Sequence, residues 1–286
     1  MSLMSCRDLL QEAYKKGYGI GEFTMRNFEF AEVIVQAARE CGAPVIIGVH
    51  KASFVKEESF ENASFAAIDL VKRQNIPLGI HLDHAKEFSE VAKAIDMGIN
   101  SVMLDVSELP FEENVRLTRK VVEYAHPRGV NVEGELGHLT GGEGGLNPPA
   151  KSDQKGFTDP LEAQEFVERT GIDYLTVSIG TVHGRYAETP RLDYDRLARI
   201  REKVKIPLIL HGGSGTPCKM LQKAIALGVA RINIYTDYAL AADDVVKKIL
   251  KENPDQLVIP DIVNKAMDRM KEVVKEKIKC FTLSML

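Results

Sequence analysis

The stretch IPLGIHLDHA at residues 76–85 places a carboxylate and two imidazoles at the end of a short apolar run. The run predicts a β-strand, whose side chains point alternately to opposite faces. Asp83 and His84 can therefore reach one cavity only if the chain turns where the strand ends. Imidazole is a common zinc ligand, and a carboxylate beside it is suited to proton transfer. On this stretch alone, two histidines that merely cap or pack at a strand end are an equally good interpretation.

Two later apolar runs end in the same way. The runs at 173–179 and 206–210 are followed by His183 and His211. If the three strand ends share one rim, these two residues and His84 form a three-histidine site that leaves a fourth ligand position open. That composition is typical of catalytic rather than structural zinc sites.

Eight apolar runs alternate with helical patterns along the whole chain, and no change in composition marks a linker. This alternation predicts an α/β fold in which residues 1–286 form a single (β/α)₈ TIM barrel with extra terminal helices. A doubly wound open sheet is the competing layout. The barrel is favoured because the repeats number eight and because polar residues stand at nearly every strand end, where barrel active sites lie. The expected strands are 18–25, 44–49, 76–82, 101–106, 130–136, 174–179, 207–210 and 230–235.

Composition limits the partners and the compartment. The chain has 286 residues, 44% of them hydrophobic, and a formal net charge of −4, which predicts neither nucleic acid nor a membrane as partner. We expect a cytoplasmic protein, because there is no run resembling a signal peptide or a membrane span. Four widely spaced cysteines are expected as thiols of a reducing compartment: Cys6, Cys41, Cys218 and Cys280.

The sequence Gly212-Gly213-Ser214 follows the seventh expected strand. Adjacent glycines let the backbone approach a ligand, and backbone N–H groups there can hold an anion. The loops after strands seven and eight are the usual phosphate site of such barrels. Asn233 and Thr236, at the end of strand eight, add polar groups beside this loop.

A long segment follows the fifth expected strand, where four glycines surround Glu143. Long loops in compact domains are usually functional or disordered. The glycines could serve as hinges of a lid that carries an acid/base group. A surface loop with an incidental glutamate remains the alternative at this point.

Six motifs occur in order along the chain: HLDHA (81–85), SVMLD (101–105), VEGELG (132–137), IGTVHG (179–184), HGGSG (211–215) and INI (232–234). Together they resemble the class II, zinc-dependent ketose-bisphosphate aldolases, the family of fructose- and tagatose-1,6-bisphosphate aldolases. The resemblance covers nearly the whole chain. It implies a (β/α)₈ barrel, one catalytic Zn²⁺ on the three histidines, dihydroxyacetone phosphate (DHAP) as donor, a role in carbohydrate metabolism such as glycolysis, and a homodimer or homotetramer.

The resemblance also implies roles for single residues. Asp83 matches the acid/base at the aldehyde oxygen, and Glu143 matches the lid glutamate that exchanges the donor's C3 proton. Glu135 matches an acid that holds zinc in an alternative position, and Asp105 is expected at a second metal position or beside a metal ligand. A monovalent cation, Na⁺ or K⁺, is implied near the backbone of the phosphate loop. The expected substrate- and phosphate-binding residues are Gly184, Gly212, Gly213, Ser214, Asn233, Tyr235, Thr236, Asn27 and His50.

Departures from the family pattern lie mostly away from the metal. Ala187 replaces a lysine near the phosphate, so we expect Arg185 or Lys51 to supply that charge. Tyr235 is larger than the usual residue, His50-Lys51 replaces a serine-bearing stretch, and glycines follow Glu143, starting at Gly144. These differences predict DHAP binding with low efficiency toward fructose 1,6-bisphosphate.

The chemistry agrees with a zinc-dependent aldehyde-lyase. Cleaving a C–C bond beside a carbonyl leaves an enediolate, which needs an electrophile, and no lysine stands at an expected inner strand end to form a Schiff base. A bound Zn²⁺ is the other solution. A metal-dependent sugar-phosphate epimerase or isomerase and a non-catalytic aldolase-like subunit are the alternatives, and release of DHAP from a ketose bisphosphate separates them from an aldolase.

Overall fold

Eight parallel strands close into a barrel in chain order, with β8 paired to β1. The computed structural model describes residues 3–54, 56–142, 149–252, 254 and 258–282. The predicted (β/α)₈ barrel is therefore confirmed, and the open sheet is wrong, because an open sheet would leave two strands at its edges. The strands are β1 (Ile20–Met25), β2 (Val45–Val49), β3 (Leu78–Ala85), β4 (Ser101–Leu104), β5 (Asn131–Leu136), β6 (Tyr174–Val177), β7 (Leu208–Leu210) and β8 (Val229–Ile234).

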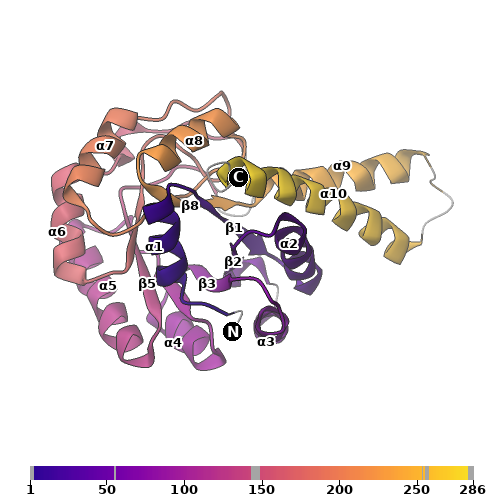
Figure 1. Ribbon diagram of the computed structural model, residues 1–286, viewed down its shortest axis with the longest axis horizontal. Helices are drawn as coiled ribbons and strands as arrows, with labels where there is room; N and C mark the ends of the chain where they lie inside the picture. The colour runs from indigo at the N-terminus through magenta and orange to yellow at the C-terminus, as the bar shows by residue number, and fades with distance from the viewer. Residues whose placement is uncertain (1–2, 55, 143–148, 253, 255–257, 283–286) are drawn as a thin grey trace.

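Helices surround the barrel and extend beyond it (Figure 1). Helix ends follow local chemistry: Gly17, Gly42 and Gly98 adopt the left-handed conformation that ends a helix. The α-helices are α1 (Cys6–Lys16), α2 (Phe28–Cys41), α3 (Glu57–Lys72), α4 (Phe88–Met97), α5 (Phe111–Ala125), α6 (Pro160–Thr170), α7 (Tyr194–Lys203), α8 (Cys218–Ala226), α9 (Thr236–Glu252) and α10 (Ile259–Phe281). Short 3₁₀ turns lie at η1 (Lys51–Ser53), η2 (His126–Arg128) and η3 (Gln154–Gly156).

Helix α1 covers the N-terminal end of the barrel. Its Cys6, Leu9 and Leu10 are buried against inward-facing strand residues such as Ile46 and Tyr174. Burial of these apolar side chains closes that end, and a separate apolar cluster lies between the strands and the outer helices. The open end is therefore the rim formed by the carboxyl ends of the strands, where sites in this architecture lie.

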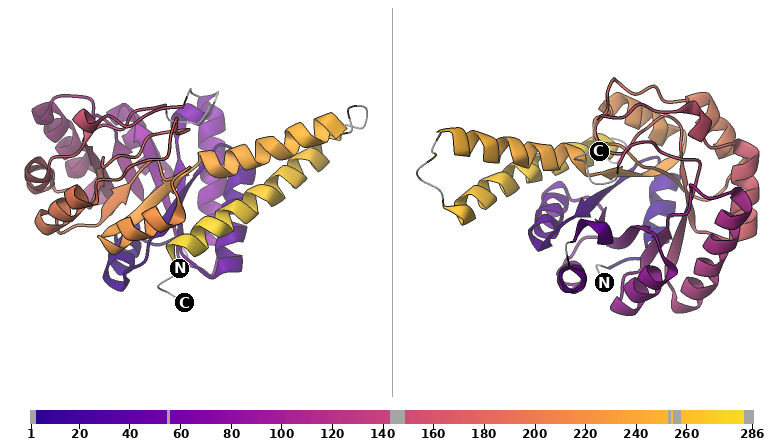
Figure 2. Two further views of the ribbon diagram at one scale, coloured as in Figure 1. Left: turned by 90° about the horizontal axis from the view of Figure 1, so that it is seen from above. Right: turned by 180° about the vertical axis from the view of Figure 1, so that it is seen from behind.

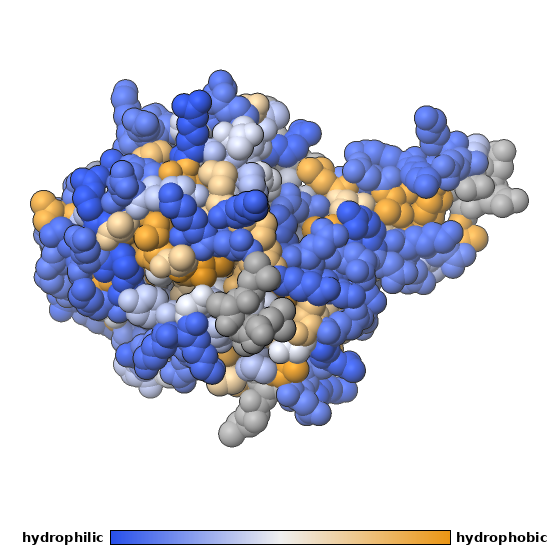
Figure 3. All heavy atoms as spheres, turned by 45° about the horizontal axis from the view of Figure 1, so that its top comes forward, coloured by the Kyte–Doolittle hydropathy of each residue, from blue (hydrophilic) through white to orange (hydrophobic). Residues whose placement is uncertain are grey.

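Helices α9 and α10 form a hairpin that projects from the barrel (Figures 1 and 2). Helix α10 also packs against α2 and α8. Apolar side chains remain exposed along this hairpin (Figure 3), among them Leu250, Val258 and Ile259. No helix within the described ranges is long and apolar enough to cross a membrane.

Two of the four cysteines form a disulfide, so the expectation of four thiols is wrong. Cys218 begins α8 and Cys280 lies near the end of α10, 62 positions later, and their Cα atoms are 6.0 Å apart. Packing of α10 on α8 creates this proximity, which sequence spacing alone does not show. Cys6 and Cys41 are free thiols.

Candidate active site

The end of β3 turns as the sequence requires. His84 has a φ of 48°, a left-handed conformation that is rare for a residue other than glycine. The register between β3 and β4 also shifts between Leu82 and Ala85. This local distortion breaks the alternation of a regular strand, so Asp83 and His84 both line one cavity at the barrel rim.

The three predicted histidines meet in that cavity. The ring centroids of His84 lie 4.9 Å from His183 and 4.7 Å from His211. One nitrogen from each ring lies within 4.8 Å of the other two. His84 and His211 are buried and His183 is partly buried, so the three rings form a compact, sheltered group of potential metal ligands.

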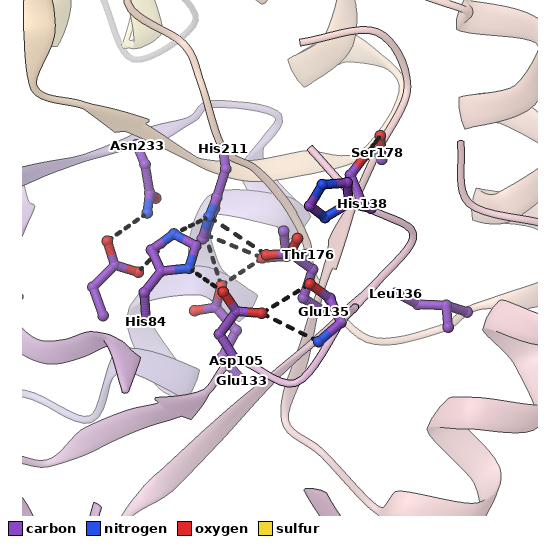
Figure 4. Close-up of polar contacts among 12 residues, drawn as sticks. His84, Asp105, Glu133, Glu135, Leu136, His138, Thr176, Ser178, His211 and Asn233 are labelled. Carbon is purple, nitrogen blue, oxygen red and sulfur yellow. Dashed lines mark hydrogen bonds and ion pairs between the residues drawn. The ribbon is translucent and has the colours of Figure 1, made fainter. Parts of the chain in front are cut away.

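Carboxylates fix the orientation of two of these rings (Figure 4). Asp105 Oδ2 lies 3.0 Å from His84 Nδ1, and Glu133 Oε1 lies 3.0 Å from His211 Nε2. The remaining nitrogens, His84 Nε2 and His211 Nδ1, face each other at 3.0 Å. Two nitrogens on one tetrahedral zinc lie about 3.3 Å apart, so this separation is close to what a shared ion needs. The residues present therefore fit a zinc ion. Asp105 and Glu133 would each accept a hydrogen bond from one ring nitrogen and leave the other nitrogen of that ring to bind the metal.

A second group of potential ligands overlaps the first. Oxygen atoms of Asp105 and Glu135 and a nitrogen of His84 also lie within 4.8 Å of one another. Glu135 Oε2 is 3.8 Å from His211 Nδ1. The structure thus places Glu135 and Asp105 where an alternative metal position would be expected, with His84 common to both groups.

A buried ionic network that the sequence analysis missed lies beneath the histidines. Arg231 on β8 contacts Glu22 on β1 at 3.0 Å and Glu133 on β5 at 2.7 Å, all inside the barrel. Burial raises the pKa of Glu22 well above its usual value. Burial also opposes ionisation of Glu133, but the charge of Arg231 outweighs it and holds the pKa of Glu133 well below its usual value. Glu133 is therefore the charged partner of Arg231. The available signal was a charged residue inside each of three expected strands, β1, β5 and β8.

Asp83 is buried beside the histidines and is oriented through Asn233. Asn233 Oδ1 accepts from Arg231 Nε at 2.9 Å, which leaves its Nδ2 to donate to Asp83 Oδ2 at 3.5 Å. Burial raises the pKa of Asp83, but the positive charges of His84 and His211 outweigh burial, and the pKa lies below its usual value. Asp83 is thus a carboxylate, ready to accept a proton.

The glycine-rich loop after β7 forms the opposite wall of the cavity. Gly212 has a φ of 68°, and a Cβ there would lie 2.2 Å from the Val182 carbonyl oxygen, so only glycine fits. Tyr186, a residue the sequence analysis did not consider, holds this loop by donating its hydroxyl to the Gly212 carbonyl at 2.7 Å. Helix α9 begins at Thr236 beside the loop, and a helix N-terminus favours anions.

Ser214 joins the loop to the start of α9. Its Oγ accepts from the backbone N–H of Tyr235 at 3.1 Å and of Asp237 at 3.3 Å. A hydroxyl has two acceptor positions and one donor, so the Ser214 O–H remains to donate. The cavity is lined by Thr24, Arg26, His50, Asp83, His84, His183, Gly184, His211, Gly212, Ser214, Asn233, Ile234, Tyr235 and Thr236.

Some expected site residues lie elsewhere. Asn27 is exposed and caps α2, accepting from the Phe30 N–H at 3.1 Å; the preference for asparagine at this helix position could have predicted it. Gly213 is buried behind the loop, against Ile232 and the Asn233 carbonyl. Glu143 and Gly144 fall outside the described residues.

Neither of the two cations suggested to replace the missing lysine lines the cavity. Lys51 Nζ pairs with Glu90 at 2.9 Å and with Glu57 at 3.2 Å, and Arg185 is exposed. Among the arginines and lysines that the structure describes, Arg26 lines the cavity. The sequence analysis missed it because no recognised motif covers the end of β1.

Known proteins share both the sequence and the fold. A family model described as "Fructose-bisphosphate aldolase class-II" matches residues 4–284. The chain is 41% identical over 286 residues to a protein named fructose-bisphosphate aldolase from Staphylococcus epidermidis, covering 99% of each chain. The structure of the YdjI aldolase from Escherichia coli K12 superposes with a TM-score of 0.84 at 36% identity, over 98% of this chain and 97% of that one. A putative fructose-1,6-bisphosphate aldolase from Coccidioides immitis gives a TM-score of 0.85 at 30% identity, over 97% and 96%.

Proposed function

The chain belongs to the class II fructose-bisphosphate aldolase family and is an aldolase; on that premise we propose that it depends on zinc and reversibly cleaves a phosphorylated ketose to DHAP and an aldehyde. The observation that carries the proposal is the paired orientation of His84 and His211. Each ring has one nitrogen beside a carboxylate, and the other two nitrogens face each other at 3.0 Å. His183 supplies the third ligand.

Zn²⁺, when bound, supplies the positive charge that stabilises negative charge developing at the substrate carbonyl. Asp83 removes the proton of the C4 hydroxyl in the cleavage direction and returns it in condensation. Its position beside the histidines supports this role, and its lowered pKa keeps it ionised before the proton transfer. Glu143 exchanges the donor's C3 proton, a role that rests on the family resemblance alone.

The donor phosphate binds between the loop after β7 and the start of α9. The Ser214 O–H, the N-terminus of α9 at Thr236 and the close approach allowed by Gly212 support this placement. Gly184 also lines this cavity. We also propose a Na⁺ or K⁺ ion near the backbone of Gly184 and Gly212, tested by the dependence of the KM for DHAP on each cation.

The protein is further proposed to be a homodimer or homotetramer that works in the cytoplasm, as one catalytic unit of 286 residues. The projecting α9–α10 hairpin with its exposed apolar side chains supports association. Phosphorylated sugars are intracellular compounds, which supports the compartment.

Release of DHAP from ketose phosphates tests the activity. Purified protein is incubated with fructose 1,6-bisphosphate, tagatose 1,6-bisphosphate and singly phosphorylated ketoses, and DHAP is measured with a coupled dehydrogenase. We expect DHAP from at least one substrate, with a kcat/KM for fructose 1,6-bisphosphate below about 10⁴ M⁻¹s⁻¹, the lower end for ordinary enzymes. Interconversion of sugar phosphates without DHAP release would instead show an epimerase or isomerase, and no reaction with any of them would show a non-catalytic relative.

A further inference from the structure

Arg26 stands at the cavity mouth directly after β1 and before the cap of α2. It is the only arginine or lysine among the described residues that line the cavity. Its guanidinium carbon lies 4.6 Å from the ring centroid of Tyr235. The stack on the ring and the fixed backbone between a strand and a helix cap both limit the freedom of this long side chain.

The rest of the wall indicates which half of the substrate Arg26 meets. The proposed donor phosphate occupies the side formed by the ends of β6, β7 and β8, and Asp83 marks the scissile bond at the end of β3. The remaining side, at the ends of β1 and β2, is formed by Thr24, Arg26 and His50. An acceptor aldehyde held beside Asp83 would therefore extend over this side of the barrel.

We propose that Arg26, held by its stack on Tyr235, is a specificity-determining residue that binds an anionic group on the acceptor half of the substrate. Arginine presents a planar fork of N–H donors that matches a carboxylate or a phosphate in two parallel hydrogen bonds. Tyr235 fills the space beside that fork, so it acts as a positioning residue. The inference rests on the proposed DHAP-dependent aldol reaction and adds the charge class of the second substrate.

Condensation of DHAP with matched aldehydes tests the proposal in the zinc-loaded enzyme. One pair, glyceraldehyde and glyceraldehyde 3-phosphate, differs by a phosphate; the other, butyraldehyde and succinic semialdehyde, differs by a carboxylate. We expect wild type to prefer the anionic member of at least one pair, and the pair that shows the preference identifies the anion. Arg26→Ala should lower kcat/KM for that member by roughly 10–100-fold, the usual value of a charge-assisted contact, and leave the neutral member unchanged.

Four further variants separate a loss of anion binding from a general loss of structure. Arg26→Lys should retain part of the preference, because it keeps the charge and loses the fork. Tyr235→Phe should keep the preference and Tyr235→Ala should reduce it, because only the first keeps the ring. Arg119→Ala is the control, since Arg119 is exposed on α5 and pairs with Glu123.

Two results would overturn the assignment. Equal decreases in kcat/KM for the anionic and the neutral aldehydes in Arg26→Ala would show that Arg26 does not bind the anionic group. An increase in the KM for DHAP without a change for the acceptor would place Arg26 on the donor side. Failure of the proposed aldolase function would give another result: the wild-type enzyme would condense DHAP with none of the four aldehydes.

Discussion

At the scale of single residues, Asp105 fixes which nitrogen His84 turns toward the proposed metal site. The carboxylate lies 3.0 Å from His84 Nδ1 and 2.7 Å from Lys86 Nζ. Burial opposes its ionisation, but the hydrogen bonds to His84 and Lys86 hold the pKa of Asp105 well below its usual value. A permanent negative charge at this position keeps the Nδ1 proton on His84 and leaves Nε2 as the nitrogen that would bind the proposed zinc ion.

Asp105→Asn should therefore weaken zinc binding by roughly 10–100-fold, the usual effect of removing a partner of a metal-bound histidine. The affinity is measured by competition with a chromophoric chelator. Asp69→Asn is the matched control, because Asp69 is exposed on α3 and pairs with Arg73. Unchanged affinity in Asp105→Asn would show that the Asp105 contact does not orient a zinc ligand.

Two assays, cleavage and tritium exchange, should distinguish the proposed acid/base roles of Asp83 and Glu143. Asp83→Ala should lose cleavage by about 10²-fold or more, the scale of a positioned acid/base, and should keep exchange of tritium between DHAP and water. Glu143→Ala should lose both reactions. Zinc content is measured for each variant. Loss of exchange in zinc-loaded Asp83→Ala, to the same extent as cleavage, would contradict the division of roles.

At the scale of elements, the end of β3 shows how much of the site could be predicted from the sequence. The motif His81-Leu82-Asp83-His84 predicted a strand end, and the need for a turn followed from strand geometry. The left-handed backbone at His84 supplies that turn. Which charged strand residues face one another could not be predicted. Glu22 and Arg231 lie more than 200 positions apart in the sequence and meet only because β1 pairs with β8.

The contact between α8 and α10 gives a prediction at this scale. The disulfide closes a loop of 62 positions, and such a constraint typically stabilises a protein by about 2–4 kcal/mol. Reduction of air-oxidised protein with a phosphine should lower the free energy of unfolding in urea by about this amount. Cys218→Ser should be as stable as the reduced wild type and should not respond to the phosphine. Complete alkylation of Cys218 and Cys280 in the air-oxidised protein would show that the bond does not form.

At the scale of the whole molecule, the α9–α10 hairpin extends well beyond the barrel (Figure 2). Ile259 is 67% exposed and Leu250 is 44% exposed on this hairpin. Apolar surface of this kind usually marks contact with another protein surface, and association of identical chains with closed symmetry is the common solution.

Light scattering after gel filtration should therefore give two or four times the chain mass of 31.7 kDa. The double variant Leu250→Asp/Ile259→Asp should shift the mass toward one chain, because it places charges in the proposed contact. Leu161→Asp is the control, since Leu161 is 65% exposed on α6, on the barrel rather than the hairpin. A wild-type mass of one chain would exclude the homo-oligomer.

The most direct test of the proposed function measures cleavage turnover against bound zinc in one preparation. Metal is removed with a chelator and Zn²⁺ is then added in steps, with bound metal determined by mass spectrometry. We predict that turnover disappears with the metal and returns in proportion to zinc, reaching its maximum at about one ion per chain because three histidines form one site. Full turnover in metal-free protein, with a substrate adduct trapped on a lysine by borohydride, would contradict zinc dependence.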